Sequence, residues 1–77
     1  MKLKKWLKYI DPIGIDVVIF TSDNEENPEY EGDIFNIPWQ LVEFKIDDSK
    51  DEPIYFYTKV NEFGVTTIVA TINLIAE

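Results

Sequence analysis

Apolar residues near the beginning of the chain recur with the spacing of an α-helix. Leu3, Trp6, Leu7 and Ile10 stand at i, i+3, i+4 and i+7, with lysines between them. A proline at position 12 disfavours helical geometry in the residue before it, so we expect the helix to end near Ile10. Because lysines near a helix N-terminus oppose the macrodipole, this helix should form by packing its apolar stripe on a sheet.

The rest of the chain is dominated by short segments in which apolar and polar residues alternate, as they do in β-strands. Polar, turn-forming stretches separate these segments. The predicted strands cover residues 14–21, 30–35, 42–47, 54–60 and 65–76. The first becomes apolar on both faces towards its end, so we expect it to be central in the sheet, with the second strand pairing back on it.

This order of elements predicts an α+β fold in a single domain that spans residues 1–77. An N-terminal helix would pack on a bent antiparallel sheet of about five strands, the last three of which are joined by short hairpins. A helix followed by five bent strands is also the order of Sm-like small barrels. The basic RNA-contacting residues expected of such a module are not evident in this sequence.

The stretch YEGDIFNIPW, residues 30 to 39, interrupts the alternation with turn chemistry. Gly32 in a strand indicates a bulge or a close backbone approach. A proline suits the first turn of a helix, so NIPWQL is expected to form one helical or 3₁₀ turn, with Asn36 as a possible cap. Trp39 and Leu41 would then close one end of the core. An exposed, recognition role is the alternative for Trp39.

Charge and composition narrow the range of partners. The 77 residues carry fifteen acids against seven lysines and no arginine, a formal net charge of −8. A field of that sign repels nucleic-acid phosphates and anionic lipids and favours basic proteins. No apolar run approaches the roughly 20 residues of a membrane-spanning helix. The sequence therefore predicts no direct nucleic-acid or membrane partner, and the absence of cysteine agrees with a cytoplasmic location.

The residue types needed for most catalytic and metal sites are missing. Without histidine or cysteine, the chain lacks the commonest general base, the thiol nucleophile and the usual transition-metal ligands. Carboxylate pairs could act as acid and base, but the acids here are expected to be solvated in turns or on outward strand faces. We therefore expect no enzymatic activity, no catalytic residue, no cofactor and no designed metal site, with at most weak calcium binding.

The acids are concentrated in two groups that can form a binding surface. The first has no basic residue among its members, and the second surrounds Lys50. The first group is Asp23, Glu25, Glu26, Glu29, Glu31 and Asp33, and the second is Asp47, Asp48, Asp51 and Glu52. Solvation of turns explains such acids without any partner. Alternatively, outward carboxylates about 7 Å apart along a strand imitate the charge of a nucleic-acid backbone, and the surface docks on a basic groove.

Parts of the chain resemble a group of small acidic proteins encoded by phages and prophages. The resemblance rests on LxxxLxxID (Leu3, Leu7, Ile10, Asp11), on VVIF in the first strand and on YEGDIxxIPW, and it covers roughly residues 3 to 46. Asn36 departs from the pattern, because an aspartate is usual before the Ile-Pro. The group has no settled activity, so the resemblance implies no site residues. It implies a context in which small acidic proteins, such as anti-CRISPRs and restriction inhibitors, bind and block host proteins.

Two functions follow as expectations. In the first, the protein inhibits a basic host protein, a nucleic-acid-processing or defence factor, by stoichiometric binding through the first acidic group and Trp39. In the second, it is a structural or self-assembling module without enzymatic activity, in which the long last strand pairs edge to edge with another copy through Thr66 and residues 68–74.

Overall fold

The N-terminal helix is shorter than its apolar stripe. In the computed structural model, which describes residues 1–11 and 14–76, α1 spans Leu3–Trp6. The backbone then tightens into turns, with the N–H of Lys8 donating to Lys5 O (3.2 Å) and that of Tyr9 to Trp6 O (3.0 Å). No side chain caps the N-terminus of α1, and so short a helix depends on packing. Leu3 is fully buried in the core, with Trp6, Leu7 and Ile10 packed against it, so the predicted apolar face is confirmed.

Five strands form one mixed sheet, which confirms the α+β class and the number of strands. They are β1 (Ile15–Thr21), β2 (Tyr30–Asp33), β3 (Lys45–Ile46), β4 (Ile54–Val60) and β5 (Thr66–Ile75), in the order β2-β1-β5-β3, with β4 also on β5. As predicted, β1 is central and β2 returns antiparallel to it. However, β1 and β5 run parallel from Ile15↔Ile68 to Thr21↔Leu74, so the sheet is not purely antiparallel.

The segment between β3 and β4 is not a hairpin. Both strands pair antiparallel with β5, β3 at Leu74 and Ile75 and β4 from Thr66 to Ile72, so they lie one after the other along the same strand. Asn73 lies between the two paired stretches: its carbonyl accepts the N–H of Asp47 and its own N–H donates to Pro53 O, both at 2.9 Å. Residues 47–53 therefore leave the sheet and rejoin it opposite a single residue.

This arrangement corrects the expectation that the last strand is an edge. β5 lies between β1 on one side and β3 and β4 on the other, so residues 68–74 have no unpaired edge to offer a second copy. Thr66 pairs with Val60 of β4 and lies before the stretch of β5 that pairs with β1. Within the described residues the outer strands are β2 on one side and β3 and β4 on the other, and the sheet is open and not closed as in a small barrel.

The predicted strand over residues 42–47 is mostly replaced by a helical turn. A 3₁₀ turn, η1 (Ile34–Asn36), and a short helix, α2 (Trp39–Val42), follow β2, and only Lys45–Ile46 remain extended. The predicted turn at NIPWQL is thus confirmed, but Asn36 does not cap α2, whose N-cap residue is Pro38. Asp47, expected to point outward, is buried because Ser49 donates both its N–H and its hydroxyl to the Asp47 carboxylate.

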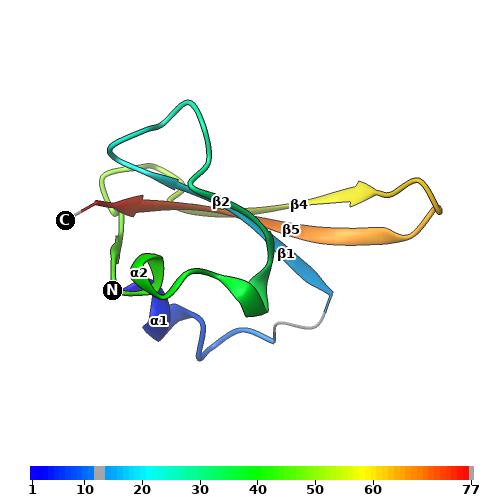
Figure 1. Cartoon of the computed structure of the whole chain (residues 1–77), viewed down its shortest axis with the longest axis horizontal. Helices are drawn as coiled ribbons and strands as arrows, with labels where there is room; N and C mark the ends of the chain where they lie inside the picture. The colour runs from blue at the N-terminus through cyan, green and yellow to red at the C-terminus, as the bar shows by residue number, and fades with distance from the viewer. Residues whose placement is uncertain (12–13, 77) are drawn as a thin grey trace.

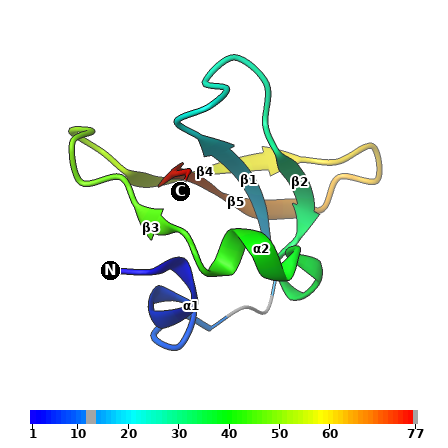
Figure 2. The same ribbon diagram turned by 60° about the vertical axis from the view of Figure 1, so that its left-hand side comes forward.

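The core lies between one face of the sheet and the helical segments. Figures 1 and 2 show α1, α2 and η1 on the same side of the sheet, while the hairpin of β4 and β5 extends beyond them. The opposite face, which carries Val18, Val69 and Thr71, has no helix packed on it in the described part of the chain, although Val69 and Thr71 are themselves buried. The buried core comprises Leu3, Val17, Ile19, Ile34, Leu41, Ile46, Ala70, Ile72 and Leu74.

Candidate functional site

The first acidic group lies in the connection between β1 and β2 and on β2 itself. Asn24 organises the connection, because its Oδ1 accepts the N–H groups of Glu26 and Asn27, both at 3.1 Å. The Glu29 N–H donates to Ile19 O at 2.7 Å and returns the chain to the sheet. All six acids of the group, Asp23, Glu25, Glu26, Glu29, Glu31 and Asp33, are exposed.

The regular spacing expected of this group holds for one pair only. Glu31 and Asp33 lie two residues apart on β2, so both project from the uncovered face of the sheet. The other four acids lie in the connection, where the backbone turns and does not repeat. The group is therefore an exposed acidic surface with one strand-spaced pair, and its geometry does not reproduce a nucleic-acid backbone along its length.

A lysine from the second acidic group joins the two groups. Lys50 Nζ forms an ion pair with the Glu25 carboxylate, across 25 positions of sequence, and this hydrogen bond raises the pKa of Lys50. Both acidic loops consequently lie at the end of the molecule opposite the tip of the β4–β5 hairpin (Figure 1). Of the second group, Asp48, Asp51 and Glu52 are exposed, whereas Asp47 is buried and the Ser49 hydrogen bonds lower its pKa.

The end of β2 connects the acids to an exposed aromatic ring. Asp33 is the N-cap of η1: its Oδ1 accepts the N–H of Phe35 at 2.7 Å, while its carbonyl oxygen accepts the Tyr30 hydroxyl at 2.6 Å. In this short turn Ile34 is buried and Phe35 is 70% exposed. Gly32 marks neither the predicted bulge nor a close backbone approach, because the pairing with β1 is unbroken and a Cβ there would meet a side-chain atom, the Tyr30 hydroxyl oxygen at 3.3 Å.

Trp39 does not close the core. It is 73% exposed at the start of α2, whereas Leu41, two residues later, is buried. The structural interpretation of Trp39 is therefore wrong, and its exposure is compatible with the alternative, a role in recognition. A four-residue helix that buries Leu41 turns Trp39 to the other side.

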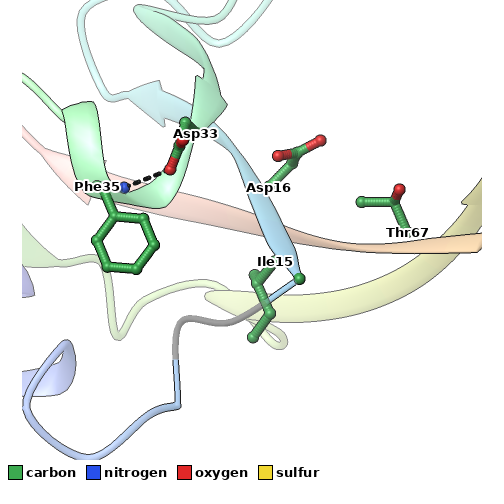
Figure 3. A pocket seen from close by; sticks show the side chains of 6 residues that line it. Ile15, Asp16, Asp33, Phe35 and Thr67 are labelled. Atoms are coloured by element: carbon green, nitrogen blue, oxygen red, sulfur yellow. Dashed lines mark hydrogen bonds between the residues drawn. The ribbon is translucent and has the colours of Figure 1, made fainter.

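A hollow of about 300 Å³ adjoins this segment, lined by Gly14, Ile15, Asp16, Asp33, Phe35 and Thr67. Asp16 on β1 is the register partner of Asp33 on β2, so the two acids leave neighbouring strands on the same face of the sheet. Figure 3 shows the Asp33 carboxylate directed to the Phe35 N–H, from which it accepts a hydrogen bond, and the Asp16 carboxylate projecting from β1 on the side away from the Phe35 ring. A cation placed here would meet two negative charges and an aromatic ring.

Two members of this site, Asp16 and Phe35, were not predicted from sequence. Asp16 looked like an ordinary polar residue in an alternating strand, and only the register Asp16↔Asp33 brings it to the acidic group. Phe35 belongs to the apolar pair Ile34-Phe35, of which the turn buries Ile34 and exposes Phe35, and the sequence holds no signal that tells the two apart.

The described residues contain no group of three or more acidic side chains arranged to hold a metal ion. Among the helices of that part of the chain, none has the length and apolar content needed to cross a membrane. No family model matches this sequence, and comparisons with curated proteins and with solved structures find no significant match.

Proposed function

We propose that this protein is a small, phage-type binding protein that attaches to a basic surface of a host protein in the host cytoplasm and inhibits it stoichiometrically. It acts by occupying that surface and not by catalysis. The observation that carries the proposal is the hollow lined by Asp16, Asp33 and Phe35, next to which the exposed acids of the first group continue along β2 and into the connection between β1 and β2.

The hollow suits a lysine or arginine side chain. Asp16 and Asp33 are opposite residues of neighbouring strands, and no basic residue is among the side chains that line the hollow, so a partner's cation would relieve the repulsion between the two like charges. The Phe35 ring adds a face on which the cation or its aliphatic stem can pack. Glu31 on the same strand and Glu29 before it extend the negative field along β2 and steer a basic partner towards this site.

The nature of the partner follows from the sign of the charge and from the resemblance of YEGDIFNIPW to phage proteins. A host nucleic-acid-processing or defence factor has a basic groove and fits both. Anionic groups on this surface then take the position of nucleic-acid phosphates, although their arrangement copies the charge and not the regular repeat.

The first experiment captures proteins from a bacterial host lysate on the immobilised protein and identifies them by mass spectrometry. Binding of the purified partner is then measured by calorimetry at increasing salt and in competition with duplex DNA. Because the contacts are exposed charge pairs, the dissociation constant should rise steeply with salt, and DNA should compete. Binding that survives high salt unchanged and ignores DNA would contradict the proposal.

Two variants with equal net charge locate the site. The test variant is Asp16→Asn/Glu29→Gln/Glu31→Gln, which removes three charges at the hollow and along β2. The control is Asp51→Asn/Glu52→Gln/Glu62→Gln, which removes three exposed charges elsewhere. We expect the test variant to weaken binding by about tenfold or more and the control by less than about threefold. Equal losses would mean that only the overall charge matters and that the hollow is not the site.

Phe35 and Trp39 are tested by truncation in the same assay. Phe35→Ala should weaken binding because the ring lines the hollow, and Trp39→Ala reports whether the surface extends onto α2. Both side chains are largely exposed, so neither truncation should lower the thermal stability much. Unchanged affinity in Phe35→Ala would remove the hollow from the interface.

A further inference from the structure

The hairpin of β4 and β5 leaves a backbone edge unpaired at the end of the molecule remote from the acidic loops. β4 pairs with β5 alone, and its other edge has no strand partner among the described residues. Figure 1 shows this hairpin extending beyond the helical layer. Its side chains are unusually apolar for an exposed arm: Phe63 at the tip is 81% exposed and Val60 on β4 is 66% exposed.

The register of the hairpin identifies which backbone groups of β4 are free. The N–H of Asn61 donates to Val65 O (3.0 Å) and that of Asn73 to Pro53 O (2.9 Å), so odd-numbered residues of this strand are hydrogen-bonded towards β5. The N–H and C=O groups of the even-numbered residues therefore point away from β5. These residues are Ile54, Phe56, Thr58 and Val60.

We propose that this edge binds the same edge of a second copy, with the two β4 strands antiparallel and centred on Tyr57. This surface is distinct from the acidic site proposed above. In this register Ile54 lies opposite Val60 of the second copy and Phe56 opposite Thr58, so all four pairs of free residues can exchange backbone hydrogen bonds. The two sheets become one continuous sheet, with the helical layers of both copies on the same side.

The charges of β4 fit a second copy in this register. Lys59 is the only charged residue of the strand, and it lies opposite Tyr55 of the second copy and not opposite another lysine. The nearest acid in the turn is Glu62, which balances Lys59, so the hairpin is neutral in a chain of net charge −8. Antiparallel pairing also places the two acidic ends at opposite extremes of the dimer, where their repulsion is smallest.

The apolar side chains of the arm gain cover in the same arrangement. The Trp6 ring of α1 lies 6.3 Å from the Phe56 ring, so the helical layer reaches the sheet at Phe56. In the paired register Phe56 of one copy is beside Thr58 and near Val60 of the other. The exposed Val60 thereby lies next to the face of the second copy that its helical layer covers. Val60 loses solvent exposure in the dimer and stays exposed in an isolated molecule.

Sedimentation equilibrium of the full chain, from about 10 μM to about 1 mM, tests the association at low and at about 0.5 M salt. We expect a monomer–dimer equilibrium that tightens as salt rises, because salt screens the repulsion between two copies of charge −8. A protein that stays monomeric at the highest concentration in both salts would overturn the proposal. It would do so even if a strand of another protein binds the β4 edge instead.

Matched variants test the surface. Val60→Lys adds a cation on the free edge, whereas Val65→Lys adds the same charge in the turn, off that edge. Val60→Lys should raise the dimer dissociation constant by about tenfold or more, and Val65→Lys by less than about twofold. Equal effects, or none, would show that the copies associate elsewhere.

Disulfide trapping tests the register, and the chain has no cysteine of its own to interfere. Tyr57 faces Tyr57 of the second copy in a pair with Cα atoms about 4.5 Å apart, so Tyr57→Cys should cross-link on oxidation. Lys59 lies about 14 Å from its counterpart in this register, so Lys59→Cys should not cross-link. Both variants must retain the wild-type circular dichroism spectrum. Equal cross-linking of the two would overturn the register and, with it, the proposed pairing.

Discussion

Replacing glycine by alanine at two positions tests how the end of β2 is built. Gly32 and Gly64 both have positive φ, 151° and 78°, but their surroundings differ. An added Cβ at Gly64 meets nothing within 4 Å, whereas one at Gly32 lies 3.3 Å from the Tyr30 hydroxyl oxygen. That hydroxyl donates a 2.6 Å hydrogen bond to Asp33 O, so moving it also loosens the start of η1.

The expected costs follow from these geometries. At Gly64 the left-handed conformation costs an alanine about 1–2 kcal/mol, from which about 0.4–1 kcal/mol is recovered in the unfolded state, so the net loss is about 1 kcal/mol. At Gly32 the strain is about 1–3 kcal/mol, and loss of the Tyr30 hydrogen bond adds about 1 kcal/mol. After the same recovery in the unfolded state, Gly32→Ala should therefore lower the free energy of unfolding by about 1–3.5 kcal/mol.

Urea denaturation of both variants, with the tryptophan fluorescence as the probe, measures the two losses. A Tyr30→Phe background provides the control, because the nearest atom to the added Cβ is then the ring carbon at 3.6 Å, an ordinary contact. In that background the cost of Gly32→Ala should fall by about 1 kcal/mol. If Gly64→Ala costs as much as Gly32→Ala, or if the background changes nothing, the close approach of the Tyr30 side chain to Gly32 does not matter to the fold.

Three further substitutions test the core, the cap of η1 and the loss of stability at acid pH. Ile72→Ala, at a fully buried position of β5, should lower the free energy of unfolding by about 2–5 kcal/mol in thermal or urea unfolding. Asp33→Ala removes the cap of η1 and should cost about 0.5–2 kcal/mol by the same measurement. The Ser49 hydrogen bonds lower the pKa of Asp47, so their stabilisation is complete above about pH 4 and disappears as the pH falls further. Asp47→Asn should flatten that part of the stability–pH curve, and an unchanged acid limb would contradict this.

The strands were predictable where their own residues decide the conformation. β1, β4 and β5 are rich in β-branched and aromatic residues, and their observed bounds lie within a residue or two of the predicted ones. Pairing was not predictable, because the alternation of side chains in a strand is the same whether its neighbour runs parallel or antiparallel. The parallel contact of β1 with β5 joins residues about 50 positions apart, and nothing local encodes it.

Residues 42–47 show why local alternation can mislead. Val42, Phe44 and Ile46 alternate as in a strand, yet the turn that begins after Pro38 continues through Val42 and leaves only Lys45–Ile46 extended. Asp47 was expected in solvent because it is charged, but Ser49 satisfies its carboxylate, and a satisfied carboxylate can be buried.

The exposed acids of the candidate site were predictable from sequence, but the hollow was not. Exposed acids follow from the polarity of the connection and of β2, and all six are exposed. The hollow depends on the register of Asp16 with Asp33 and on the direction in which η1 turns Phe35. The pairing of β1 with β2 sets the first, and the burial of Ile34 sets the second, and neither can be read from the local pattern of residues. The sequence favours a buried Trp39 over the exposed one that the structure shows, because large apolar rings are highly buried on average.

The separation of charge from apolar surface links the two proposals and gives them opposite dependences on salt. The acidic loops joined by Lys50 and Glu25 lie at one end, and the neutral hairpin of β4 and β5 lies at the other. Added salt weakens attraction to a basic partner but also weakens repulsion between two copies, so partner binding should fall while dimerisation rises. A dimer would present two acidic sites, and a partner with two basic sites at a matching distance would be bound more tightly by both than by either. Val60→Lys should then lower the apparent affinity for a partner with two basic sites while leaving the affinity of a single acidic site unchanged. Asp16→Asn should lower both the single-site affinity and the apparent affinity.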